Sequence, residues 1–461
     1  MRKNASAVAD AAGGPERFGA RSFLRDHGVH FAYMGGAMAK AIATEELVIA
    51  LGQAGYLASF GAGGLPLERV EQAVRKIQAR LPHGPYAFNL LHSPRKLHTE
   101  EARVDLYLRY GVRTLEVSSF MTLTPSIVRY RVAGLTQRAD GSVEAANRVI
   151  VKLSRVELAA QFMDPPPPAM IAALLERGQV TPLQAALAAH VPMAGDITVE
   201  ADSGGHTDNR PLVALLPSML RLRDDIQRRR RYPTPVRIGA AGGISTPQAI
   251  LAAFMMGADY VVTGSVNQSC IEAGTSPHVK RLLAHVGMTD VAMAPESDMF
   301  EQGFKVQVVK QRSLFPMRAQ KLSDVYRKYE SLESIPDLER QALERDIFRA
   351  SLDSVWQETT AFFAVRNPEE LVRAQSPKVR MALIFRWYLG QASRWAVEGT
   401  PDREIDYQIW CGPAMGAFND WARGSYLETP ENRRVADIAR VLMSEAAALY
   451  TSHAVRMSGA S

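Results

Sequence analysis

Residues 236–265 read VRIGAAGGISTPQAILAAFMMGADYVVTGS, a strand, a loop, a helix and a second strand in direct succession. The first strand ends at the paired glycines 242 and 243, and residues 245–247 (Ser-Thr-Pro) supply a helix cap with proline in the first turn. The second strand ends at residues 263–265 (Thr-Gly-Ser). Paired glycines let backbone amides approach an anion, and a helix N-terminus favours one. The stretch therefore predicts two consecutive phosphate-binding loops; tight turns without a ligand are the alternative.

The same alternation of β-rich runs and helical patterns extends over about residues 30–265. Strands that alternate with helices indicate a parallel sheet. Eight such units favour an α/β protein with a (β/α)8 TIM barrel, with an open doubly wound sheet as the alternative. The expected strands are His30–Tyr33, Tyr56–Phe60, Tyr86–Leu90, Thr114–Val117, Arg148–Leu153, Asp196–Glu200, Val236–Gly239 and Tyr260–Thr263.

Two stretches exceed a minimal barrel. A run of four prolines at 165–168 introduces helices that we interpret as an insertion between the fifth and sixth strands. From residue 319 to about 391 the apolar residues recur with helical spacing, which predicts an inserted or appended α-helical subdomain. The expected organisation is a flexible N-terminal segment (1–27), a barrel (28–318) with a helical insertion at about 164–192, a helical subdomain (319–400) and a C-terminal segment returning to the barrel (401–461).

Composition excludes several classes of protein. The 461 residues are 47% hydrophobic and 22% charged, as is usual for globular chains. No apolar run approaches the roughly 18 residues of a membrane helix, and no secretory signal is recognisable, so we expect a cytoplasmic protein without membrane contact. Two cysteines cannot build a disulfide framework or a four-cysteine metal site, and we expect no metal.

The formal net charge of +6 is mild, and part of it lies in the arginine run at 228–231. The run lacks interleaved aromatic residues, so we expect no nucleic-acid partner. A solvated helix end is the plainest interpretation of it, and a docking point for an acidic carrier protein is the alternative.

Candidate catalytic residues follow the sixth expected strand, where residues 196–209 read DITVEADSGGHTDN. Barrel enzymes carry their catalytic residues at the carboxyl ends of the strands. This rule makes His206 a candidate proton donor or acceptor rather than a surface residue. Asn89 and Lys152, at the ends of the third and fifth strands, suit a flat, polar, anionic ligand, although hydrogen bonds within the rim explain them equally well.

Together these residues resemble the flavin-dependent barrel family of nitronate monooxygenases and FMN-type enoyl reductases. The family's Glu-Ala-Gly-Gly-His loop is similar to residues 202–206, Asp-Ser-Gly-Gly-His. Three longer strings, MGGAMAKAIATEELVIALGQAGYLASFGAGG, EADSGGHTDNRPL and IWCGPAMGAFNDW, resemble the PfaD subgroup, the trans-acting enoyl reductases of polyunsaturated fatty acid and trans-acyltransferase polyketide synthases. The resemblance extends over about residues 28–450.

The resemblance implies bound FMN, NADPH as hydride donor, and reduction of an α,β-unsaturated thioester on an acyl carrier protein of such a synthase. His206 is the implied acid, with water as the other candidate donor. The helical subdomain would face substrate or carrier, or serve packing in a homodimer. A nitronate monooxygenase-type flavin oxidase and a flavin-free scaffold remain as alternatives. The implied cofactor-binding residues are Met34, Gly35, Gly36, Asn89, Lys152, Ser203, Gly204, Gly205, Gly242, Gly243, Thr263, Gly264 and Ser265.

Overall fold

The computed structural model describes residues 14–92, 97–297 and 299–457, which form two compact units. As far as it is described, the first unit comprises Met1–Ser203, Asp208–Gly274 and Ala417–Ser461, and the second comprises Gly204–Thr207 and Thr275–Gly416. The division at residue 274 differs from the boundary expected at 318. The reason is a β-hairpin after residue 290, whose first strand packs against the helix Phe315–Lys328 of the helical unit.

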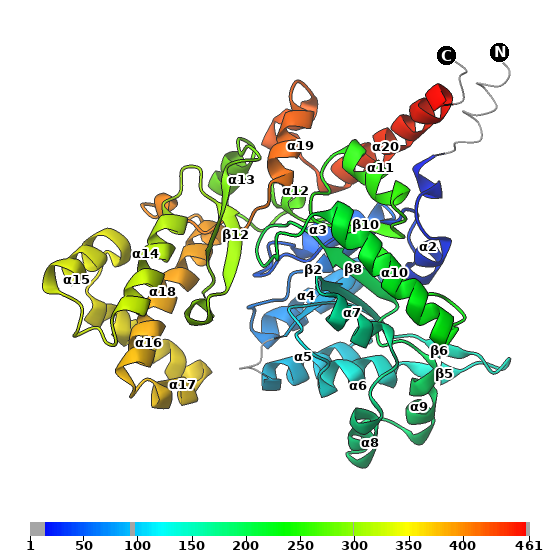
Figure 1. The fold of residues 1–461 in the computed structure, drawn as a ribbon, viewed down its shortest axis with the longest axis horizontal. Helices are drawn as coiled ribbons and strands as arrows, with labels where there is room; N and C mark the ends of the chain where they lie inside the picture. Colours follow the sequence, from blue (N-terminus) through cyan, green and yellow to red (C-terminus); the bar gives the residue numbers. More distant parts are fainter. Residues whose placement is uncertain (1–13, 93–96, 298, 458–461) are drawn as a thin grey trace. The chain divides into compact units, whose positions relative to one another are not determined.

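The first unit contains the expected closed barrel of eight parallel strands (Figure 1). Its interior and the surface beneath its helices are filled by buried aliphatic and aromatic side chains. Around the barrel the strand order is β1-β10-β9-β8-β7-β4-β3-β2. The strands are β1 (Tyr33–Gly35), β2 (Leu57–Phe60), β3 (Ala87–Leu91), β4 (Thr114–Ser118), β7 (Arg148–Leu153), β8 (Asp196–Glu200), β9 (Arg237–Ala241) and β10 (Tyr260–Thr263).

Local capping sets where the surrounding helices begin. The Thr246 hydroxyl accepts a hydrogen bond from the Ala249 amide at 3.2 Å, as the Ser-Thr-Pro sequence predicts. Thr44 and Thr124 cap two further helices in the same way. The helices of this unit are η1 (Pro15–Arg17), α2 (Arg21–His27), α3 (Glu45–Gln53), α4 (Leu67–Arg80), α5 (Leu97–Arg109), α6 (Pro125–Ala133), α7 (Val156–Met163), α8 (Pro168–Glu176), α9 (Pro182–Leu187), η2 (Ala188–His190), α10 (Leu212–Arg230), α11 (Pro247–Met255), α12 (Ser265–Gln268), η6 (Tyr426–Glu428), η7 (Pro430–Asn432) and α20 (Val435–Met457).

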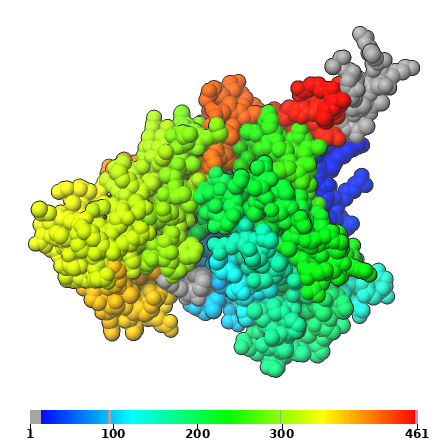
Figure 2. All heavy atoms as spheres, viewed as in Figure 1, coloured from blue at the N-terminus to red at the C-terminus, as the bar shows by residue number. Residues whose placement is uncertain are grey.

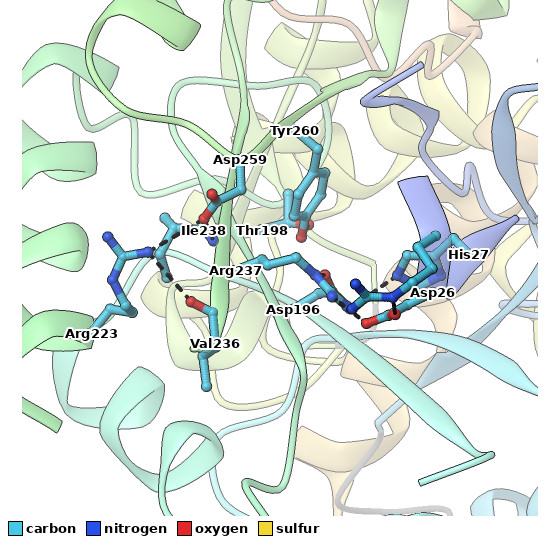
Figure 3. Close-up of polar contacts among 11 residues, drawn as sticks. Asp26, His27, Asp196, Thr198, Arg223, Val236, Arg237, Ile238, Asp259 and Tyr260 are labelled. Carbon is cyan, nitrogen blue, oxygen red and sulfur yellow. Dashed lines mark hydrogen bonds and ion pairs between the residues drawn. The ribbon is translucent and has the colours of Figure 1, made fainter. Parts of the chain in front are cut away.

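A buried ionic network closes the amino-terminal end of the barrel (Figure 3). Asp196, at the start of β8, accepts two hydrogen bonds from Arg237 at 2.6 and 2.8 Å and contacts His27 of α2 at 3.1 Å. Arg237 also donates to Asp26 at 2.6 Å. Although burial opposes the charged form, Arg237 and His27 hold the pKa of Asp196 well below its ordinary value. The network ties α2 to two barrel strands.

Part of the N-terminal segment 1–27, which the sequence predicted to be flexible, is helical instead. Residues 1–13 lie outside the described residues, but residues 14–27 form η1 and α2, and His27 is buried. The apolar face of α2 explains the order, because Phe23 stacks on Tyr260 with ring centroids 4.4 Å apart.

The second unit combines a hairpin with a group of helices, which Figure 2 shows mainly in yellow and orange. The strand β11 (Val291–Pro295) pairs antiparallel with β12 (Lys305–Val309) and packs against α14 (Phe315–Lys328). The amphipathic pattern expected from residue 319 onward is confirmed by successive helices. The elements are α13 (Pro277–Leu283), β11 (Val291–Pro295), η3 (Phe300–Gln302), β12 (Lys305–Val309), α14 (Phe315–Lys328), α15 (Asp337–Leu343), η4 (Glu344–Phe348), α16 (Leu352–Arg366), α17 (Pro368–Arg373), α18 (Pro377–Glu398), η5 (Glu404–Asp406) and α19 (Ala414–Ala422), the last leading back into the first unit.

Three sequence-based assignments need correction. The first strand begins at Tyr33, not His30, because its pairing with β10 starts only at Tyr33 and Val261. A small hairpin of β5 (Leu135–Gln137) and β6 (Val143–Ala145), largely exposed, was not anticipated. Strand β11 was also missed, since its short mixed sequence has no clear alternation and depends on pairing with β12.

Candidate active site

Three charged side chains of neighbouring barrel strands interact, two at the carboxyl ends of β7 and β8 and one in the middle of β4. Lys152 on β7 lies with its Nζ 3.1 Å from Oε1 of Glu200 on β8. Glu116 on β4 is completely buried, and its charge acts on Lys152. The Lys152 and Glu200 side chains are 21% and 17% exposed, so this end of the barrel is open enough for them to meet a ligand. We call these residues the Glu116–Lys152–Glu200 cluster.

The cluster shifts the protonation of its members. Burial disfavours the Lys152 ammonium, but the carboxyl groups of Glu200 and Glu116 outweigh burial and raise its pKa. Burial raises the pKa of the Glu116 carboxyl, against the opposing influence of Lys152. Lys152 is thus a fixed cation at neutral pH, and Glu116 is biased toward its neutral form.

Expected ligand-binding residues from β1 and β3 lie beside the cluster. Gly36 follows β1, and a β-carbon placed on it would lie 3.6 Å from Oε1 of Glu116. Asn89 on β3 donates to the backbone oxygen of Glu116 at 3.0 Å and to Ser118 Oγ at 3.1 Å. The structure thus places Gly36 and Asn89 next to Glu116, the residue whose charge acts on Lys152. Met34 and Gly35 lie within β1 itself, whereas the sequence placed them after the first strand, which was expected to end at Tyr33.

The two glycine loops after β9 and β10 have the form that a phosphate needs. Gly242 has a φ of +83°, and a β-carbon on it would lie 2.7 Å from the backbone of Ala201, so only glycine fits there. By contrast, β-carbons on Gly243 and Gly264 would meet no atom within 4 Å. The buried Ser245 hydroxyl has no hydrogen-bond partner among the described residues. Open space beside Gly243 and Gly264 fits an anion, and the unpaired Ser245 hydroxyl in the loop of Gly243 could donate a hydrogen bond to it. Thr263 and Ser265 flank Gly264, where β10 ends and α12 begins.

The loop that carries His206 belongs to the second unit. Gly205 and Gln307 of β12 exchange two backbone hydrogen bonds of 2.9 and 2.7 Å. The His206 side chain is 52% exposed, and its Nε2 lies 4.0 Å from Oε1 of Glu296, too far for a hydrogen bond. Ser203 donates to Glu200 at 3.3 Å, which links the start of this loop to the cluster on the barrel. His206 is therefore presented on a backbone paired with β12, as an accessible imidazole.

Glu116 and Glu200 were missed as site residues by sequence reasoning. Glu116 occurs in the strand TLEVS, where an acidic residue interrupts an otherwise buried run. Such an interruption is the signal that could have identified it, because a charged residue is rarely fully buried without a partner. Glu200 is the last residue of the strand DITVE, where its position next to the candidate loop is the signal that could have identified it.

Two other kinds of site are absent from the described residues. These residues contain no group of three or more His, Cys, Asp or Glu side chains arranged to hold a metal ion. Within the same part of the chain, no helix combines the length and the apolar character needed to cross a membrane.

Comparison with known proteins identifies the family to which this chain belongs. Residues 26–346 match the nitronate monooxygenase family model. The crystal structure of the enoyl reductase domain of MlnA, from the macrolactin biosynthesis cluster of Bacillus amyloliquefaciens, is 38% identical and superposes with a TM-score of 0.92, covering 96% of this chain and 99% of that one. The chain belongs to the PfaD branch of the nitronate monooxygenase family.

Two curated relatives of this PfaD chain are named for fatty acid or polyketide biosynthesis. The chain is 52% identical over 415 residues to a polyunsaturated fatty acid synthase subunit of Thraustochytrium sp., in an alignment that covers 89% of this chain but 28% of that protein. It is 43% identical over 435 residues to polyketide biosynthesis protein PksE of Bacillus subtilis, covering 94% of this chain and 56% of PksE. The chain thus spans between about a quarter and about half of these relatives. Residues 329–407 separately match the inserted helical domain of [acyl-carrier-protein] S-malonyltransferase.

The residues present fit the flavin that this family implies. The open glycines 243 and 264 and the unsatisfied Ser245 hydroxyl suit a phosphate, and the cluster with Asn89 suits the edge of a polar ring. Both features lie at the carboxyl end of the same barrel.

Proposed function

We propose that this protein is an FMN-dependent enoyl-acyl-carrier-protein reductase that works in trans with a polyketide or polyunsaturated fatty acid synthase. The observation that carries the proposal is the similarity to the enoyl reductase domain of MlnA, which extends over 96% of the chain and includes the helical unit as well as the barrel. A nitronate monooxygenase needs no acyl carrier, whereas residues 329–407 resemble a domain inserted in an enzyme named for acyl-carrier-protein chemistry.

In this proposal the barrel binds FMN and NADPH reduces it. Bound FMN would supply the hydride that is transferred to the β-carbon of an α,β-unsaturated thioester. Lys152 and Asn89 would bind the polar edge of the ring, and the Lys152 charge would favour developing negative charge there. Gly242, Gly243, Gly264 and Ser265 would hold the phosphate through backbone amides and the first turn of α12.

His206 would hold the thioester carbonyl and donate the proton that the α-carbon needs. A neutral-pH acid must be accessible to substrate, and the imidazole is half exposed. Glu296 lies within reach of a small side-chain rotation and would stabilise the imidazolium form. Water is the competing proton source.

The helical unit would receive the acyl chain or the carrier protein. Two observations support this role. Residues 329–407 match the helical domain inserted in [acyl-carrier-protein] S-malonyltransferase, and the relatives are named as a polyunsaturated fatty acid synthase subunit and a polyketide biosynthesis protein.

An anaerobic visible-absorption experiment tests the proposed function. The purified protein, loaded with FMN, is reduced with NADPH and then mixed with a crotonyl-carrier thioester. Bleaching by NADPH and recovery of the yellow colour with the thioester, with butyryl-carrier as product by mass spectrometry, is the expected result. Recovery of the colour only with oxygen or a nitronate would instead indicate a flavin oxidase. Failure of the protein to bind FMN would indicate the flavin-free scaffold.

A further inference from the structure

Glu116 is a carboxyl side chain with no exposed surface in the middle of β4. Its Oε2 accepts a hydrogen bond from the Ala37 amide at 2.8 Å. Its Oε1, which is itself buried, makes no hydrogen bond of ordinary geometry to a described residue, although the Ser59 hydroxyl lies close enough to interact with this carboxyl. An unpaired buried carboxyl oxygen is costly, and a bound molecule that completes its hydrogen bonding is one way to offset that cost.

The open oxygen faces the part of the barrel where a ligand is expected. It lies 3.6 Å from the position of a β-carbon on Gly36, in the glycine-rich loop after β1. Lys152 and Glu200 approach from β7 and β8 and form the other half of the cluster. With both carboxyl groups ionised the cluster carries a charge of −1, and with Glu116 protonated it is neutral.

The neutral form is the one the surroundings favour. Burial raises the pKa of Glu116 more than Lys152, the Ala37 amide and the nearby Ser59 hydroxyl lower it, and the carboxylate of Glu200 raises it further. Glu200 already pairs with Lys152 at 3.1 Å, so the ammonium does not depend on Glu116 for a counter-charge. A protonated Glu116 has one O–H to donate, since its other oxygen accepts from Ala37.

We infer that Glu116 is a cofactor-positioning residue whose protonated carboxyl donates a hydrogen bond from Oε1 to an acceptor atom on the ring of the bound flavin. Lys152 supplies a second donor beside it. Two adjacent donors recognise a ring edge that carries carbonyl or imine acceptors, and they disfavour a ring edge that carries donors. The inference depends on the proposed function only for the identity of the ring.

Flavin affinity of the apoprotein tests this inference without enzyme turnover. FMN would be titrated into apo wild type, Glu116→Gln and Glu116→Leu, with quenching of flavin fluorescence as the readout. Gln keeps both contacts, because its amide oxygen accepts from Ala37 and its NH2 donates to the ring. We expect a Kd within about threefold of wild type for Gln and at least about tenfold weaker for Leu, the loss of roughly one hydrogen bond.

Glu144→Gln and Glu144→Leu, in the exposed hairpin strand β6, are the matched controls and should leave the Kd unchanged. If Glu116→Gln and Glu116→Leu lose FMN affinity equally, Glu116 is not a neutral hydrogen-bond donor. If Glu116→Leu binds FMN as tightly as wild type, Glu116 does not contact the flavin. If Glu116→Leu does not fold, retained affinity in Glu116→Gln supports the inference and lost affinity overturns it. The proposed function fails separately, when wild type binds FMN but reduces no enoyl thioester.

Discussion

Gly204 and Cys411 lie in direct backbone contact, so that a β-carbon on Gly204 would be 2.8 Å from the Cys411 Cα. The Cys411 amide also donates to Gln307 O at 3.3 Å, the oxygen that accepts from Gly205. The glycines before His206 therefore have a packing function within the second unit. This function is separate from the cofactor contact expected for them, which stays a prediction.

Gly204→Ala should displace the His206 loop. The added methyl group meets backbone atoms that cannot rotate away, and overpacking of this kind costs about 1–3 kcal/mol of stability. Thermal unfolding should show a lower Tm, and enoyl reduction should fall with FMN still bound. Gly390→Ala is the control, because that glycine lies within α18 with no atom within 4 Å of a β-carbon. It should raise stability by about 0.5–1 kcal/mol; an equal loss in both variants would contradict the packing argument.

The loop sequence alone could not assign the role of Gly204. Periodicity predicts the barrel well because eight strands repeat one pattern, and β7, β8 and β10 have the expected bounds. The position of Gly204 depends instead on residues more than 200 positions away, which no local pattern encodes. Glu116 shows the same limit: its strand was predicted, but its burial beside Lys152 results from barrel closure.

Asp196→Asn should destabilise the barrel strongly at neutral pH. The change removes the buried carboxylate that pairs with Arg237 and leaves the guanidinium with only Asp26, which is partly exposed, as counter-charge. Breaking a buried ion pair in this way typically costs about 3–5 kcal/mol. Urea unfolding followed by circular dichroism would measure the loss. Asp224→Asn, which alters an exposed pair with Arg223, should change stability by less than about 0.5 kcal/mol.

The effect of Asp196 should also depend on pH. Its pKa is depressed in the folded state, so its contribution is complete above the unfolded value of about 3.9 and is lost as the pH falls below it. The stability difference between wild type and Asp196→Asn should therefore narrow between about pH 5 and pH 3. A difference that stays constant over this range would contradict a charge-based role.

His206→Ala should separate the two halves of the proposed reaction. FMN binding and bleaching by NADPH should be retained, because the imidazole is exposed and makes no hydrogen bond to Glu296 in this structure. Return of colour with the enoyl thioester should slow by about 10²–10⁴-fold, the usual contribution of a general acid. His285→Ala, an exposed histidine on the Arg281 carbonyl, is the control. An unchanged rate in His206→Ala would leave water as the proton source.

Gly264→Ala should discriminate between FMN and riboflavin. Gly264 has a φ of −129°, and a β-carbon on it meets no protein atom within 4 Å, so the apoprotein should keep its stability. If the open space holds the phosphate, the methyl group will intrude on that group and weaken its bonds to the amides of α12. The Kd for FMN should then rise by about tenfold or more, equivalent to roughly 1.4 kcal/mol, while the Kd for riboflavin changes little. Fluorescence titration with both ligands makes the comparison within one variant. Equal weakening of both would place the ring, and not the phosphate, beside α12.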